Sequence, residues 1–77
     1  MKHKRAPHDY TVIVERLPDS EGGGFIARVL DLPGCMSDGD TDIEALENAH
    51  DAITAWIDCA RQMGRPVPHP TAQRVYA

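Results

Sequence analysis

Hydrophobic and polar residues alternate near the start of the chain and recur every three or four positions in its second half. Residues 10–17 place Tyr10, Val12 and Val14 on one face and mainly β-branched or polar residues on the other, which predicts a strand. Residues 25–30 also alternate, but with apolar groups on both faces. We therefore expect this second strand to be central, with one face under a helix and part of the other covered by a partner.

Glycine and proline residues mark the turns around these strands. Residues 18–24 end in three consecutive glycines, which permit positive φ angles and favour a hairpin. A phosphate-binding loop is disfavoured there, because no Lys-Ser or Lys-Thr follows and the next element is a strand. After the Pro33-Gly34 turn, residues 35–37 are expected to pair as a short third strand.

The helical period begins at about Asp42 and continues to Met63. Thr41 and Glu44 match a capping box, in which the Thr41 hydroxyl accepts a first-turn amide and the Glu44 carboxylate reaches back to the Thr41 amide. Gly64 is placed to cap the other end. The apolar stripe expected to face the sheet is Ile43, Leu46, Ala49, Ile53, Trp56, Ile57, Ala60 and Met63. The residues expected to face outward are Glu44, Glu47, Asp51, Asp58 and Arg61.

Three alternating prolines in residues 65–70 end the helix and favour an extended path, and residues 71–77 are expected to add an edge strand. The order β-β-β-α-β predicts an α+β fold, with one long helix packed on a small antiparallel sheet. We expect one domain over residues 10–77 after a flexible basic arm at residues 1–9. A chain of this size buries only about 60% of its unfolded surface, which favours a homo-oligomer.

The chain is acidic outside its first residues. Its formal net charge is −4, and without Lys2, Lys4 and Arg5 five basic residues remain against twelve acidic ones, a net charge of −7. Nucleic-acid binding needs clustered lysine and arginine, so this body favours a basic partner instead. No apolar run approaches the roughly 20 residues of a membrane span, and no secretory signal is recognisable, so the expected location is the cytoplasm.

Candidate chemistry is sparse. Asp38, Asp40 and Asp42 alternate near a turn but lack the glycine offset and late glutamate of a calcium loop, so turn and helix-cap roles are preferred and no metal or cofactor is predicted. The four histidines show no zinc spacing. Cys35 and Cys59 are expected to be reduced thiols packed as small apolar residues, although a disulfide stays possible. Cys35 has no identifiable base, so a catalytic cysteine is disfavoured and the chain is not expected to be an enzyme.

Several segments together resemble the N-terminal domain of HicB-type antitoxins. They are residues 10–15, 22–27, 31–41 and 44–49, of which the Asp-Leu-Pro-Gly-Cys turn, the following Gly-Asp-Thr and the alanine-rich helix are the specific part. The similarity covers about residues 10–70. Leu30 departs from the family, in which proline usually precedes this turn.

The resemblance implies a partial ribonuclease H-like fold and self-association. It also implies a partner, a small basic RNA-cleaving toxin of the HicA type, whose active site the antitoxin blocks. Many members carry a C-terminal DNA-binding domain, and the sequence to Ala77 shows none, so promoter binding is not the expected function.

The predicted function is therefore an antitoxin that covers a basic toxin surface with acidic residues. The residues predicted to contact the partner are Asp31, Asp38, Asp40, Asp51 and Asp58. Three alternatives stay open: a stand-alone HicB-like domain with a non-toxin partner, a divergent ribonuclease H-like nuclease, and a DNA-binding regulator that uses the Lys2–Arg5 arm. The nuclease alternative lacks a recognisable set of catalytic carboxylates.

Overall fold

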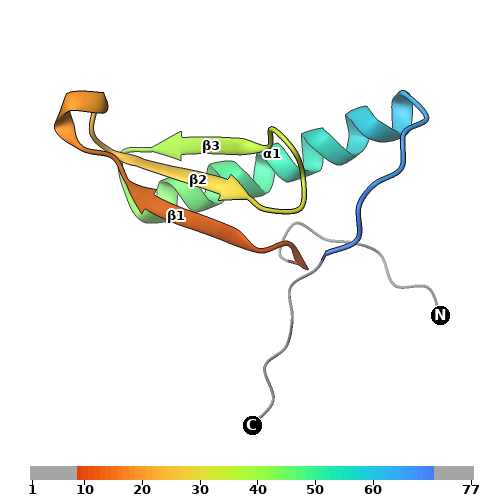
Figure 1. Ribbon diagram of the computed structural model, residues 1–77, viewed down its shortest axis with the longest axis horizontal. Coiled ribbons are helices and arrows are strands. Elements are labelled where there is room, and N and C mark those ends of the chain that lie inside the picture. The colour runs from red at the N-terminus through yellow and green to blue at the C-terminus, as the bar shows by residue number, and fades with distance from the viewer. Residues whose placement is uncertain (1–8, 71–77) are drawn as a thin grey trace, which may run out of the picture.

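Three antiparallel strands and one long helix make up the part of the chain that the computed structural model describes, residues 9–70 (Figure 1). In chain order the elements are β1 (Val12–Arg16), the short 3-10 helix η2 (Asp19–Glu21), β2 (Phe25–Val29), β3 (Met36–Gly39) and α1 (Asp42–Gln62). The strand order in space is β1-β2-β3, and α1 covers one face of the sheet. The predicted α+β fold and the central position of the second strand are confirmed. The edge strand predicted over residues 71–77 lies outside the described residues.

The alternation along β2 decides which side chains meet the helix. Ala27 lies opposite Val14 on β1 and Ser37 on β3, and it is fully buried beneath α1. Two of the helix positions in the same core are the fully buried alanines Ala45 and Ala49. Because these side chains are small, the helix backbone can lie close to the sheet.

The core between sheet and helix is closed by the segments that flank them. Leu32, in the loop after β2, and Ile53 of α1 are the largest fully buried side chains. Tyr10 is buried just before β1, and its hydroxyl donates a 2.7 Å hydrogen bond to the Pro68 carbonyl. Val67 packs against the same core, so the proline-rich segment after the helix returns to the start of β1.

The face of α1 that meets the sheet differs from the predicted stripe at its ends. Ile43 and Met63, both expected to face the sheet, are 65% and 56% exposed, whereas Ala45 is fully buried. Ile43 lies in the first turn, and Ala45 is the residue that the end of β3 contacts. Met63 follows the last helical residue and is the C-cap of α1. The spacing of apolar residues every three or four positions therefore does not by itself determine how α1 is rotated about its axis relative to the sheet.

The start of α1 is capped nearly as predicted. The Thr41 hydroxyl accepts a 3.0 Å hydrogen bond from the Glu44 amide. The Glu44 carboxylate, however, accepts a 2.5 Å hydrogen bond from the Asp40 amide and not from that of Thr41. The Glu44 side chain reaches Asp40, one residue before Thr41, because the end of β3 lies against the first turn of α1.

The end of α1 is a Schellman motif around Gly64. This glycine has a φ of +72°, its amide donates to the Arg61 carbonyl, and the Arg65 amide donates to the Ala60 carbonyl. Those two bonds satisfy carbonyls that the last turn leaves without helical partners. The prediction that Gly64 caps the helix is confirmed.

The connection from β3 to α1 depends on direct contact between two backbones. Only Asp40 and Thr41 separate Gly39, the last residue of β3, from the helix. A Cβ atom on Gly39 would lie 2.5 Å from the Ala45 amide nitrogen and 2.9 Å from the Glu44 carbonyl carbon. Such distances are far inside van der Waals contact, so no side chain fits at this position.

We expect Gly39→Ala to lower the free energy of unfolding by about 3 kcal/mol, since the added methyl group overlaps helix backbone that cannot move by itself. Gly64→Ala is the matched control, because its Cβ would meet no atom within 4 Å but its φ of +72° disfavours alanine. That strain costs about 1 kcal/mol. Urea unfolding followed by circular dichroism measures both. Equal losses in the two variants would contradict the close contact at Gly39.

Candidate partner-binding surface

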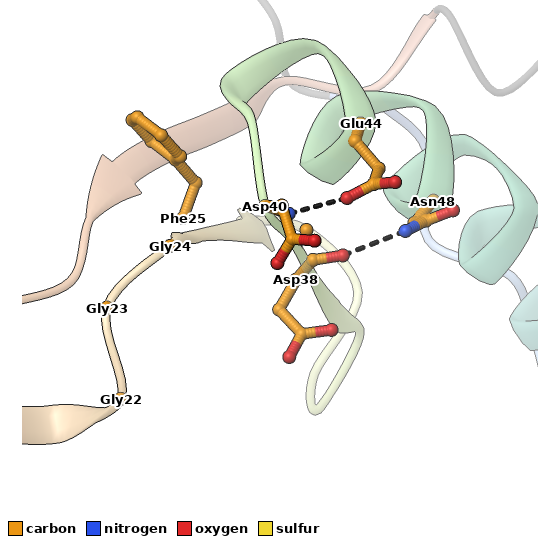
Figure 2. Close-up of a pocket in the computed structure, with 9 residues that line it drawn as sticks. Gly22, Gly23, Gly24, Phe25, Asp38, Asp40, Glu44 and Asn48 are labelled. Carbon is orange, nitrogen blue, oxygen red and sulfur yellow. Dashed lines mark hydrogen bonds between the residues drawn. The ribbon is translucent and has the colours of Figure 1, made fainter.

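A polar pocket of about 360 Å³ lies where the glycine-rich hairpin, the end of β3 and the start of α1 meet (Figure 2). Bare backbone forms one side of it and acidic or amide side chains form the other. Its lining residues are Gly22, Gly23, Gly24, Phe25, Asp38, Gly39, Asp40, Glu44 and Asn48. The pocket therefore lies beside the close backbone contact between Gly39 and the first turn of α1.

Two side chains of α1 are fixed at this pocket by bonds to the end of β3. Beside the bond from the Asp40 amide to Glu44, the Asn48 side-chain amide donates a 2.8 Å hydrogen bond to the Asp38 carbonyl (Figure 2). The Asp38 carboxylate points away from Glu44 in the same view. Within residues 9–70, no three Asp, Glu, His or Cys side chains are arranged to hold a metal ion. The hydrogen bonds of Glu44 and Asn48 therefore connect the start of α1 to the end of β3, and the carboxylates around the pocket make its surface negative.

A row of carboxylates runs along α1 on the side opposite the core. Glu44, Glu47, Asp51 and Asp58 are all exposed, and their spacings of three, four and seven residues keep them on one side of the helix. We call these four residues the acidic helix face. From Asp42 to Asp58 the helix contains no lysine or arginine.

Folding alone does not favour this arrangement. Like charges three or four residues apart, as in Glu44–Glu47 and Glu47–Asp51, destabilise a helix by a few tenths of a kcal/mol per pair. The helix dipole compensates only near the N-terminus, where Glu44 lies, and it opposes a negative charge near the C-terminus, where Asp58 lies. The acidic helix face is therefore suited to a partner that supplies the missing positive charge.

The five carboxylates predicted to contact a partner do not form one surface. Asp51 and Asp58 belong to the acidic helix face, and Asp40 borders it at the pocket. Asp38 projects from β3 on the side of the sheet that α1 leaves uncovered, opposite Ile26. Asp31 is half-buried in the loop between β2 and β3, at the other end of the sheet.

Two residues of the acidic helix face were not among those assigned to a partner. Glu44 and Glu47 were expected to face outward, and both are exposed. The seven-residue spacing of Glu44, Asp51 and Asp58 in the sequence is the signal that groups them, because seven residues are close to two full turns of a helix.

An apolar hollow of about 400 Å³ flanks the C-terminal half of the same helix. Its lining residues are Pro33, Trp56, Cys59, Ala60, Met63, Arg65 and Pro66. The Trp56 indole N–H donates a 3.0 Å hydrogen bond to the Pro33 carbonyl, which holds the ring in place. Trp56 packs against the core, as predicted, but it is only half-buried and leaves part of its ring to the hollow.

The two cysteines are free and differ in environment. Cys35 is buried in the core, and desolvation raises the pKa of its thiol. A nucleophilic cysteine needs the opposite shift, so this environment does not support catalysis by Cys35. Cys59 is exposed and does not pack as predicted, because it precedes the buried Ala60 by one residue and so points about 100° away from it around the helix.

We expect iodoacetamide at pH 8 to modify Cys59 rapidly and Cys35 at least about 100-fold more slowly, since a raised pKa lowers the reactive thiolate fraction and burial blocks access. Mass spectrometry of peptides over time measures both rates. Unfolding in urea serves as the control and should make the two rates similar. Equal rates in the native protein would contradict the burial of Cys35.

The fold and its surfaces define a small α+β binding domain that presents an acidic helix. Residues 10–76 match the family model described as HicB-like antitoxin of bacterial toxin–antitoxin system. The chain belongs to the HicB-like antitoxin family. None of the helices in the described part of the chain is long and apolar enough to cross a membrane.

Relatives with similar sequences come from an archaeon, a cyanobacterium and a bacteriophage. A UPF0150 protein of Thermoplasma acidophilum is 35% identical over 66 residues, which cover 86% of this chain and 91% of the relative. A UPF0150 protein of Synechocystis is 39% identical over 79% of this chain and 73% of its own length. An uncharacterized 14.9 kDa protein of Haemophilus phage HP1 is 41% identical over 64% of this chain and 34% of its own length. The family match gives this chain a general antitoxin role, with a toxin as its class of partner.

Proposed function

We propose that this chain is the antitoxin of a type II toxin–antitoxin pair and inhibits a small, basic, RNA-cleaving toxin of the HicA type. The acidic helix face carries this proposal. It presents four exposed carboxylates, and no lysine or arginine lies between Asp42 and Asp58. The protein acts by binding and catalyses no reaction. A toxin that cleaves RNA meets its substrate in the cytoplasm, and we place the complex there.

A toxin that cleaves RNA must hold phosphate groups with cationic side chains. Along α1, Glu44, Glu47 and Asp51 are about 5–6 Å from one to the next, and Asp58 lies two turns, or about 10 Å, further on. Their carboxylates offer those cations a negative charge, as the phosphates of RNA do. We propose that Glu44, Glu47, Asp51 and Asp58 occupy the RNA-binding surface of the toxin and so exclude the substrate. Opposite charges also speed the encounter of the two proteins.

Charge alone does not keep such a complex together, because exposed ion pairs contribute little and are screened by salt. The apolar hollow beside Trp56 supplies a second kind of contact next to the acidic row. Tryptophan is enriched among the residues that dominate binding free energy. We propose that an apolar side chain of the toxin enters this hollow and slows dissociation.

Co-purification with the toxin and an RNA-cleavage assay test the proposal. A stoichiometric excess of this chain should abolish cleavage. Asp51→Lys/Asp58→Lys should weaken inhibition about 100-fold, because like charges then face each other in the complex. The loss should shrink at high salt.

The matched control is Asp19→Lys/Glu21→Lys. It makes the same change in net charge in η2, whose residues are exposed and lie away from the outer side of α1. This variant should inhibit like the unmodified chain. A toxin that stays fully active with excess antitoxin, or an equal loss in both double variants, would overturn the proposal.

A further inference from the structure

The apolar hollow beside Trp56 has a positive charge at its rim. Arg65 is the one charged residue among the described residues that line it, and its side chain is exposed. Within residues 9–70, no carboxylate forms an ion pair with Arg65. An apolar wall with a guanidinium group at its edge fits a ligand that carries an apolar group and a carboxylate side by side.

The fold does not require an arginine at this position. Residue 65 helps to close the end of α1, but it does so through its backbone amide, which donates to the Ala60 carbonyl. Any residue except proline can donate that bond. The helix dipole favours a cation within the last turn, where Arg61 lies, whereas Arg65 follows the Gly64 turn and lies outside the helix. The Arg65 side chain is therefore available to a partner.

The charge along α1 changes sign near its C-terminal end. No lysine or arginine lies between Asp42 and Asp58, and Arg61 and Arg65 follow. The hollow lies at this basic end, since its lining includes Met63, the C-cap of the helix. A uniformly basic partner that covered both regions would place a cation against Arg65, which weakens binding.

We propose that the toxin segment entering the hollow carries an aspartate or glutamate next to its apolar side chain, and that this carboxylate binds Arg65. This inference rests on the proposed function. The apolar side chain packs beside Trp56, and the guanidinium group donates hydrogen bonds to the carboxylate. The two contacts fix the direction in which the toxin lies along α1, because a reversed toxin would place its cations against Arg65. Arg65 is thus a specificity-determining residue.

The direction of the effect of Arg65→Glu tests this assignment. The substitution makes an acidic protein more acidic, so overall charge alone predicts tighter binding to a basic toxin. The proposed contact predicts binding about 10-fold weaker, because a carboxylate of the toxin then faces another carboxylate. Isothermal titration calorimetry with the purified toxin measures the affinity, and circular dichroism confirms that the variant is folded.

The matched control is Arg61→Glu, which makes the same change in net charge. Arg61 is exposed in the last turn and does not line the hollow. This variant should bind the toxin at least as tightly as the unmodified chain. If both variants bind as tightly as the unmodified chain, this inference fails and the proposed function stands. A toxin that does not bind the unmodified chain overturns both.

Reversing the charge on the toxin identifies the partner of Arg65. Each acidic residue of the toxin is replaced by lysine in turn, and binding to the unmodified chain and to the Arg65→Glu variant is compared. One replacement should weaken binding to the unmodified chain and restore binding to the variant within about 3-fold of the original affinity. A disturbed fold in the variant cannot be rescued in this way. A series in which no toxin variant prefers the Arg65→Glu chain would overturn the pairing.

Discussion

The contact between Gly39 and the first turn of α1 is the constraint on which the rest of the structure depends. The strand backbone meets the helix backbone there, with room for no side chain. This contact fixes the rotation of α1, so Ala45, Ala49 and Ile53 face the sheet. The opposite side of the helix must then be the side that carries Glu44, Glu47, Asp51 and Asp58. A backbone contact in the fold thus decides where the acidic surface lies.

Much of the fold could be predicted from local pattern. Alternation located the strands, and the Thr41 cap and Gly64 motif located the helix ends, because each of these depends on a few neighbouring residues. The rotation of α1 could not be predicted in this way. Ile43 is more apolar than Ala45, yet Ala45 is buried and Ile43 is exposed, because β3 contacts the helix at residue 45. Cys59 is exposed for the same reason, because the rotation of α1 turns the neighbouring Ala60 towards the core instead.

The candidate surfaces were predictable only in part. Acidic residues on the helix could be recognised from their spacing, and the family could be recognised from the Asp31–Thr41 turn. The sequence did not show that Asp38 and Asp51 lie on different surfaces, since that depends on which side of the sheet each strand residue faces. The pairing of Arg28 with Ile13 and Met36 across three strands was equally hidden, because these residues are distant in the sequence.

The two sides of this domain present different chemistry. The helix side carries the four carboxylates of the acidic helix face, with Arg61 beyond them in the last turn, and the uncovered sheet side alternates charged and apolar groups.

An NMR titration of the labelled 77-residue chain with its purified toxin tests the central claim most directly. The account predicts chemical-shift changes concentrated at Asp40, Glu44, Glu47, Asp51 and Asp58, with the Trp56 indole signal also shifted. Changes confined to Ile13, Ile26, Arg28 and Met36, with the helix signals unmoved, would contradict it.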